Sequence, residues 1–271
     1  MINIINLYKK TRKYVFHRDD FYHTEAALSG VIPFLLPRVP VFIIENDLFS
    51  ALFDENQKTY DDNFPTEYLG VYCKDFNLTV LSTKYPEIPD VKCNCIFLCV
   101  NRIIDAADKL YHSDSRYNKG HLLTKVLIHE FGHAYMDLMS LGINESDPYY
   151  PYYRGNEESW ANVFTLVTVE NYLSKAGLYN KTKGGANDLM EIVIDFIKNH
   201  QPTDYSLGWF LWYCGINEYD CWAYNKHKGL EWTTWNKLAM TEFSKNSKLV
   251  PIPATVILNM KTMWESTKKK M

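Results

Sequence analysis

The sequence predicts an α+β protein, with a small, twisted and mostly antiparallel sheet in its first half and a helical second half. Short apolar segments between turn residues, which are typical of strands, occur before residue 101. From residue 120 onward, the apolar residues recur at the three- and four-residue spacing of helices. A chain of 271 residues is long enough for one domain of two lobes. We expect an α/β lobe at about 1–143 and a helical lobe at about 144–271.

The first half is expected to contain the strands and two short helices. Three prolines interrupt segment 31–44, which we expect to be extended or an edge strand, because proline cannot donate a hydrogen bond to a sheet. The polar residues 75–77 look like the turn of a hairpin. We expect strands at residues 13–21, 31–44, 69–74, 78–84 and 95–100, with the last at the sheet edge, and helices at residues 46–54 and 101–111.

The second half is expected to be a set of helices. The most apolar of them covers residues 120–139, and a polar segment rich in Tyr and Pro, residues 144–155, follows it as a loop. We expect further helices at residues 156–176, 187–200, 205–224, 230–245 and 254–268.

Composition and charge narrow the functional classes. The formal net charge is −3, and no basic face of the kind that binds nucleic acid is evident. No apolar run approaches the roughly 20 residues of a membrane span, and the first residues lack the core of a signal peptide. We therefore expect a cytoplasmic protein without a nucleic-acid or membrane partner. In that compartment, the six cysteines are expected to be free thiols.

The helix expected at residues 120–139 contains the motif His129-Glu130-Phe131-Gly132-His133. Histidines at positions i and i+4 lie on one face of a helix, where both imidazoles can reach one tetrahedral ion. Glu130 leaves the helix beside such an ion without pointing at it, so it can act as a general base toward a metal-activated water. The motif therefore predicts a zinc site with Glu130 as the catalytic residue.

A catalytic zinc needs a third protein ligand. The metzincin class would place a glycine at position 136 and a histidine at position 139, but both positions hold methionine, which excludes that class. The gluzincin class uses a glutamate on a following helix instead. We expect Glu158 as this ligand, with Glu157 as the alternative. Asn162, one turn after Glu158, is expected to hydrogen-bond the free ring nitrogen of a ligating histidine.

These residues resemble a known family. The motif of residues 129–133 and the later segment Glu158-Ser159-Trp160-Ala161-Asn162-Val163-Phe164 are similar to the zincin core of the ImmA/IrrE-type metallopeptidases, in which an H-E-x-G-H helix precedes an E-x-x-A-N-x-F helix. The resemblance covers roughly residues 66–175. It implies a zincin-like gluzincin fold, one zinc ion per chain, Glu130 as general base, and His129, His133 and Glu158 as ligands.

The expected function is therefore that of a zinc peptidase acting on a peptide or protein substrate. Peptide hydrolysis also needs a group that stabilises the oxyanion. The tyrosine-rich loop before Glu158 supplies candidates for this role or for substrate binding, namely Tyr149, Tyr150, Tyr152, Tyr153 and Arg154. Two alternatives remain open: a zincin-like binding or regulatory protein that holds zinc with little turnover, and a purely structural zinc that joins two helices.

Overall fold

The computed structural model describes residues 1–8, 14–53, 68–138, 150–180, 187–201, 208–209 and 212, and only the backbone of residues 150–156. Within these residues the protein has the expected α+β class. Its helical and strand elements are β1 (Ile4–Asn6), η1 (Arg18–Phe21), α1 (Tyr22–Ser29), β2 (Val41–Ile44), α2 (Asn46–Phe53), β3 (Gly70–Asn77), α3 (Thr79–Ser82), β4 (Lys92–Cys99), α4 (Val100–Tyr111), α5 (Lys119–Leu138), α6 (Tyr150–Lys175) and α7 (Asp188–Asn199).

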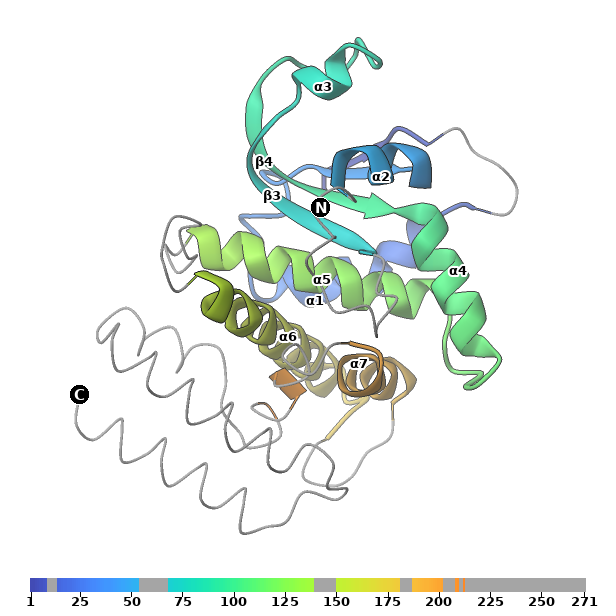
Figure 1. Ribbon diagram of the computed structural model, residues 1–271. Helices are drawn as coiled ribbons and strands as arrows, with labels where there is room; N and C mark the ends of the chain where they lie inside the picture. Colours follow the sequence, from blue (N-terminus) through green and yellow to red (C-terminus); the bar gives the residue numbers. More distant parts are fainter. Residues whose placement is uncertain are drawn as a thin grey trace, which may run out of the picture.

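The four-stranded sheet has the order β1-β2-β4-β3 and is mixed. The expectation of a mostly antiparallel sheet is wrong: β1 pairs with β2 and β2 with β4 in parallel, and only β3 and β4 pair antiparallel. Parallel neighbours need a crossover connection, and η1 with α1 supplies it between β1 and β2 (Figure 1). The same topology places β2 inside the sheet rather than at its edge. Pro40 lies just before β2, where a missing N–H costs no ladder bond, and its carbonyl accepts from Ile96 N.

The polar residues 75–77 do not form the expected hairpin turn. They end β3, after a break in register between Cys73 and Phe76, and Asp75 has a positive φ of 48°. A shift of this kind marks a β-bulge or a similar irregularity, and aspartate tolerates the left-handed backbone seen at Asp75, as it does in turns. The segment expected as a strand at 78–84 begins with the short helix α3, and β3 pairs instead with β4. Residues 13–21 were also expected to form a strand, but residues 18–21 form the 3-10 helix η1.

The position of the sheet edge is a second correction. Segment 95–100 was expected at the edge beside the active helix, but β4 lies between β2 and β3, and its last five residues are buried. The edge strand beside α5 is β3, and β1 lies at the other edge of the sheet. Figure 1 shows β3 running along α5, and a Cβ on Gly70 would lie 2.9 Å from Val126 Cγ1 of that helix.

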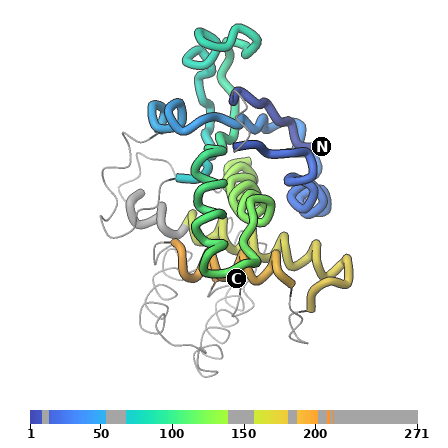
Figure 2. The backbone as a smooth tube through the Cα atoms, turned by 90° about the vertical axis from the view of Figure 1, so that its right-hand side faces the viewer, coloured from blue at the N-terminus to red at the C-terminus, as the bar shows by residue number. Residues whose placement is uncertain are grey.

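Helix α5 occupies the middle of the described structure. One face of the sheet packs against α2 through an aromatic cluster that includes Phe42, Phe49 and Phe97. The other face packs against α5, and α6 and α7 lie beyond α5 (Figures 1 and 2). Fourteen of the 20 residues of α5 are buried. Its two histidines and Glu130 are therefore held by packing on all sides rather than displayed on a free helix.

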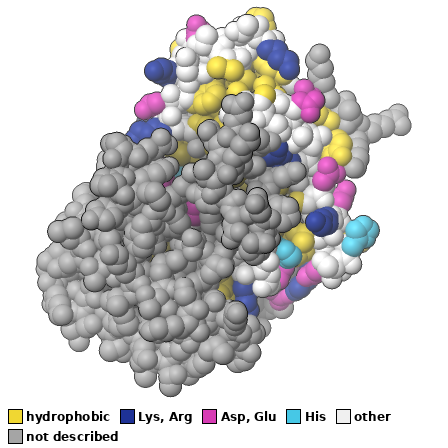
Figure 3. Space-filling model, viewed as in Figure 1, with side chains coloured by type: hydrophobic (Ala, Val, Ile, Leu, Met, Phe, Trp, Pro, Cys, Tyr) yellow, Lys and Arg dark blue, Asp and Glu magenta, His cyan; other side chains and the backbone are white. Residues whose placement is uncertain are grey.

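The expected helices agree with the structure at α2, α4, α5 and α7 within one residue at each end. Helix α6 begins at Tyr150, six residues before the expected start at 156, so residues 150–155 are helical and not part of a loop. The helices expected at 230–245 and 254–268 and nearly all of 205–224 lie outside the described residues. None of the described helices is long and apolar enough to cross a membrane. On the face seen in Figure 3, charged side chains of both signs are interspersed among apolar ones.

Candidate metal centre

The motif side chains are brought to α6 by close helix packing. His129, Glu130 and His133 are only 5%, 7% and 9% exposed. Beside them, Gly132 meets α6 with no side chain: a Cβ there would lie 3.1 Å from Phe164 Cδ1 and 3.4 Å from Ala161 Cα. Glycine at 132 therefore lets the two helices approach until side chains of α6 reach the histidines.

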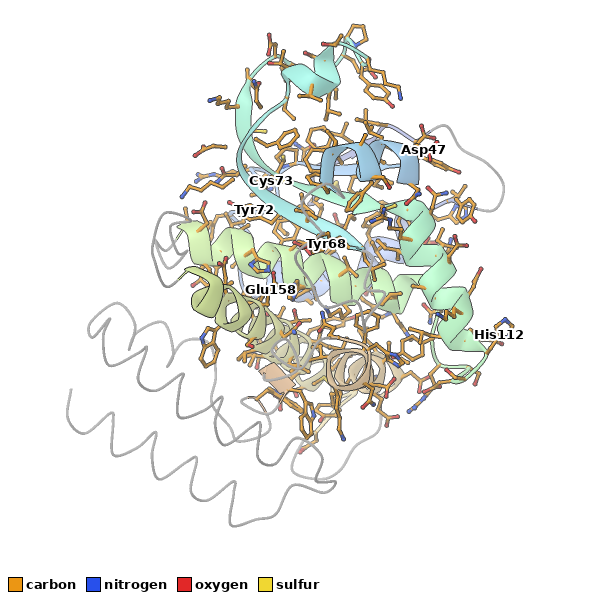
Figure 4. The ribbon with its side chains drawn as sticks, in the orientation of Figure 1. Asp47, Tyr68, Tyr72, Cys73, His112 and Glu158 are labelled. Carbon is orange, nitrogen blue, oxygen red and sulfur yellow. The ribbon has the colours of Figure 1, made fainter. Side chains whose placement is uncertain are left out.

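Three ligand atoms converge between α5 and α6. Glu158 Oε2 lies 2.9 Å from His129 Nε2 and 3.2 Å from His133 Nε2, and the two Nε2 atoms are 3.3 Å apart. Figure 4 shows Glu158 on α6, next to α5. Bonds of about 2.0–2.1 Å to a tetrahedral zinc ion separate its ligand atoms by about 3.3 Å. The spacing of the three atoms therefore fits one metal ion between them.

The chemistry of these donors supports the same conclusion. Two ring nitrogens and a carboxylate oxygen all turn acceptor lone pairs toward one point, which is favourable only with a proton or a cation there. Among the residues that the structure describes, His129, His133 and Glu158 form the one such group of three metal-ligating side chains. These three residues can hold a metal ion, as expected from the sequence.

Glu157 is placed on the other side of His133. Its Oε1 lies 3.2 Å from His133 Nδ1, the ring nitrogen that faces away from Glu158. A carboxylate at that position accepts the Nδ1–H proton and leaves Nε2 free to bind a metal ion. Glu157 thus orients a histidine, which is the role expected of Asn162. Asn162 is buried on α6, and its Nδ2 donates to Gln201 Oε1 at 2.9 Å. Within the described part of the chain, His129 Nδ1 has no hydrogen-bond partner.

Glu130 lies beside the cluster and faces the sheet. Its Oε2 accepts a hydrogen bond of 2.7 Å from the backbone N–H of Tyr72, on the edge strand β3. Gly70 makes this approach possible, because a Cβ there would lie 3.3 Å from Glu130 Cγ and closer still to Val126. The sequence analysis missed both Tyr72 and Gly70. Only the position of β3 against α5 reveals them, and no local pattern in the sequence indicates it.

Burial changes the acidity of Glu130. Removal from water disfavours the charged carboxylate, and this effect raises the pKa of Glu130 to about 7, although His133, Lys125 and the Tyr72 N–H act in the opposite direction. A carboxylate with a pKa near neutrality can both accept and return a proton at physiological pH.

Lys125 is a buried cation that the sequence analysis also missed. It lies on α5 one turn before His129, is 2% exposed, and places Nζ 5.1 Å from the centre of the Phe196 ring. Burial lowers the pKa of Lys125 to about 8, partly offset by the carboxylates of Glu130 and Glu158. A single lysine on the apolar face of a helix, four residues before a ligand, is the signal that could have identified it.

The ligands themselves are strongly coupled. Burial together with the positive charge of Lys125 lowers the pKa of His129 to about 3, despite the neighbouring Glu158. Burial also acts to lower the pKa of His133, but the carboxylates of Glu158 and Glu157 outweigh it and raise that pKa well above its ordinary value. Conversely, the two histidines outweigh burial and hold the pKa of Glu158 well below its ordinary value. Glu158 is thus ionised and ready to ligate, whereas His133 must lose a proton before it can.

The tyrosine candidates are placed only in part. Residues 150–154 lie in the first turns of α6, the helix that carries Glu158. The side chains of Tyr150, Tyr152, Tyr153 and Arg154, and Tyr149 as a whole, lie outside the described residues.

Comparison with other proteins adds no further constraint. No protein-family model, no curated protein and no solved structure matches this chain. The assignment of the site therefore rests on its own geometry, and what that geometry establishes is a group of two histidines and a glutamate that can hold a metal ion.

Proposed function

We propose that this protein is a zinc-dependent peptidase. The observation that carries the proposal is that two glutamates of one buried site occupy different positions: Glu158 lies with the histidines, and Glu130 lies beside them. Glu158 Oε2 converges with the two histidine nitrogens, whereas the Glu130 carboxylate is held apart from them by the Tyr72 N–H. A ligand set of two histidines and one glutamate, with a further glutamate beside it, is the arrangement used by hydrolytic zinc enzymes.

Zinc is the metal that best suits these donors. Imidazole nitrogens with one carboxylate oxygen, at separations that fit tetrahedral bonds, favour zinc over magnesium or calcium, which prefer sets of oxygen ligands. Within the described chain the cluster offers three ligand atoms and no fourth. Structural zinc sites are closed by four protein ligands, so three ligands support a catalytic site over a structural one.

The residues would divide the work of hydrolysis between them. His129, His133 and Glu158 would hold the zinc ion, which when bound supplies a Lewis acid that acidifies water and polarises a carbonyl group. Glu130 would accept a proton from the attacking water as the water oxygen bonds to the peptide carbonyl carbon. It would then deliver that proton to the nitrogen as the C–N bond breaks.

The edge strand suggests how a substrate would be held. Just before β3, Leu69 O accepts from Cys99 N of β4, whereas the Tyr72 N–H in β3 points away from β4 and toward Glu130. Backbone groups of an antiparallel strand alternate in this way, so every second residue of β3 faces the free edge beside α5. An extended peptide would pair with this edge by strand addition. The edge lies at β3, and not at residues 95–100 as expected from the sequence.

A peptide digest with a matched variant tests the proposal. The zinc-loaded protein and its Glu130→Gln variant are incubated with a peptide library derived from a proteome, and products are identified by mass spectrometry. We expect cleavage by the parent protein, no cleavage by Glu130→Gln, and equal zinc content in both.

Other outcomes would contradict the proposal in distinguishable ways. Equal cleavage by the two proteins would show that Glu130 is not the base. Full zinc content with no cleavage by the parent would favour the alternative of a zinc-holding binding protein over that of an enzyme.

A further inference from the structure

Tyr72 is attached to α5 at both ends. Its backbone N–H donates to Glu130 Oε2 at 2.7 Å, and its side-chain hydroxyl donates to Asp137 Oδ2 at 2.8 Å. Glu130 and Asp137 are seven residues apart, which places them on the same face of the helix and about 10 Å apart along its axis. Figure 4 shows Tyr72 between β3 and α5. One residue of the edge strand therefore contacts two carboxylates of the helix that carries the metal ligands.

Asp137 is the acceptor for three side chains of the sheet. Besides the Tyr72 hydroxyl, it accepts from Lys74 Nζ at 2.5 Å and from Asn94 Nδ2 at 3.2 Å. Its own side chain is 14% exposed, so its bonds to Tyr72 and Asn94 are partly shielded from water, whereas the bond from Lys74, which is 63% exposed, is open to solvent. Burial, with Asp137 as the hydrogen-bond acceptor, raises the pKa of Tyr72 above its ordinary value. The hydroxyl therefore stays a neutral donor. The group ties the end of α5 to both β3 and β4.

The hydrogen bonds to Asp137 hold β3 on the side that, among the described residues, has no neighbouring strand. Within the part of the chain that the structure describes, β3 pairs with β4 alone, and their register breaks just after Cys73. On the opposite side of Tyr72, Gly70 touches α5 with no room for a Cβ. Strand β3 is thus held against the helix at Gly70 and again at Asp137, and the amide that binds Glu130 lies between these two contacts.

We propose that Tyr72 is a positioning residue for Glu130. Its hydroxyl, through Asp137, fixes the edge strand so that its own amide holds the Glu130 carboxylate in one orientation beside the metal ligands. Tyr72 acts through Glu130 and takes no part in bond making. The kinetic consequence rests on the proposed peptidase function, whereas the hydrogen-bond geometry does not.

Kinetics of two matched variants test the consequence. Tyr72→Phe removes the hydroxyl that donates to Asp137. Tyr117→Phe is the control, because it removes a hydroxyl that donates to Asp195 at 2.6 Å elsewhere in the core. A displacement of about 1 Å at a reacting group costs about 100-fold in rate. We expect Tyr72→Phe to lower kcat by about 10- to 100-fold, with KM within about twofold and zinc content unchanged. Equal kcat in the two variants would overturn the proposal.

A second measurement needs no activity. In the zinc-loaded, ¹⁵N-labelled protein, the amide proton of residue 72 should exchange slowly with solvent and should shift upfield in Glu130→Gln, because a neutral acceptor forms a weaker bond. Its exchange should become at least about tenfold faster in Tyr72→Phe and in Asp137→Ala but not in Tyr117→Phe. Unchanged exchange in both of the first two variants would refute the positioning role. If the parent protein cleaves no peptide, the peptidase function fails while this measurement still decides the role of Tyr72.

Discussion

Replacing Glu130 with glutamine should stabilise the metal-free protein, and by more at pH 8 than at pH 5. The pKa of Glu130 is raised from 4.5 to about 7 in the folded protein, with burial as the main cause. Between these two values the folded state binds more protons than the unfolded state, so stability falls as pH rises. Glutamine does not ionise and is free of this penalty. Its amide oxygen can still accept the Tyr72 N–H.

The size of the effect follows from the shift in pKa. At 1.36 kcal/mol per unit, the full penalty above pH 7 is about 3 kcal/mol. At pH 5 the unfolded carboxyl is already mostly ionised, which leaves about 1 kcal/mol of the penalty there. The difference in unfolding free energy between Glu130→Gln and the parent should therefore grow by about 2 kcal/mol from pH 5 to pH 8.

Urea unfolding after treatment with a chelator measures this difference, with the free energies extrapolated linearly to water. Glu87→Gln, at an exposed carboxylate, controls for the loss of one negative charge. The reasoning is refuted if the difference between Glu130→Gln and the parent is the same at both pH values. Bound divalent metal should reduce the difference at pH 8, because a nearby cation favours the ionised carboxylate.

Three further predictions concern the same site. The first concerns His133, whose pKa is raised by Glu158 and Glu157 despite its burial, so that this histidine is protonated in the metal-free protein at pH 7. Zinc binding should therefore release about one proton and tighten with rising pH. Calorimetry in buffers of different ionisation enthalpy measures the proton release, and release of no proton would contradict this prediction. The second concerns Lys125→Met, which removes a buried cation whose pKa is lowered to about 8 by burial. The metal-free variant should be more stable than the parent at pH 7 in urea unfolding, and it should bind zinc more tightly in competition with a chromophoric chelator. Weaker zinc binding by this variant would show that the lysine is not repelling the metal ion. The third concerns Gly70→Ala, which places a Cβ 2.9 Å from Val126 Cγ1. It should destabilise the fold by about 1–3 kcal/mol, measured by thermal or urea unfolding. An unchanged unfolding midpoint would show that β3 can move away from α5 at no cost.

The metal ligands could be found from the sequence because their chemistry is local. Two histidines four residues apart share a helix face in any protein, and Met139 excludes one way of completing the site. The small residues Gly132 and Ala161 then indicate where a second helix can approach, and the structure places them in contact. The sequence favoured Glu158 as the third ligand but left Glu157 open, and the structure separates them: Glu158 Oε2 reaches both Nε2 atoms, whereas Glu157 lies at His133 Nδ1.

The surroundings of Glu130 could not be found in this way. The Tyr72 N–H that holds Glu130 comes from 58 residues earlier in the chain, and the bond exists only because β3 is the edge strand next to α5. The sequence indicated strands but not their order, which depends on crossover connections between distant segments. Residues 75–77 show the same limit, since the left-handed backbone that Asp75 tolerates occurs in turns and in irregular strands alike.

The central claim is that His129, His133 and Glu158 hold one zinc ion in the chain, and metal content tests it most directly. The protein is purified without chelator and measured by inductively coupled plasma mass spectrometry beside His129→Ala, Glu158→Ala and, as a control outside the cluster, His112→Ala. The account predicts about one zinc per chain in the parent and in His112→Ala, with little or none in the other two variants. Absence of zinc from the parent, or equal zinc in all four proteins, would contradict it.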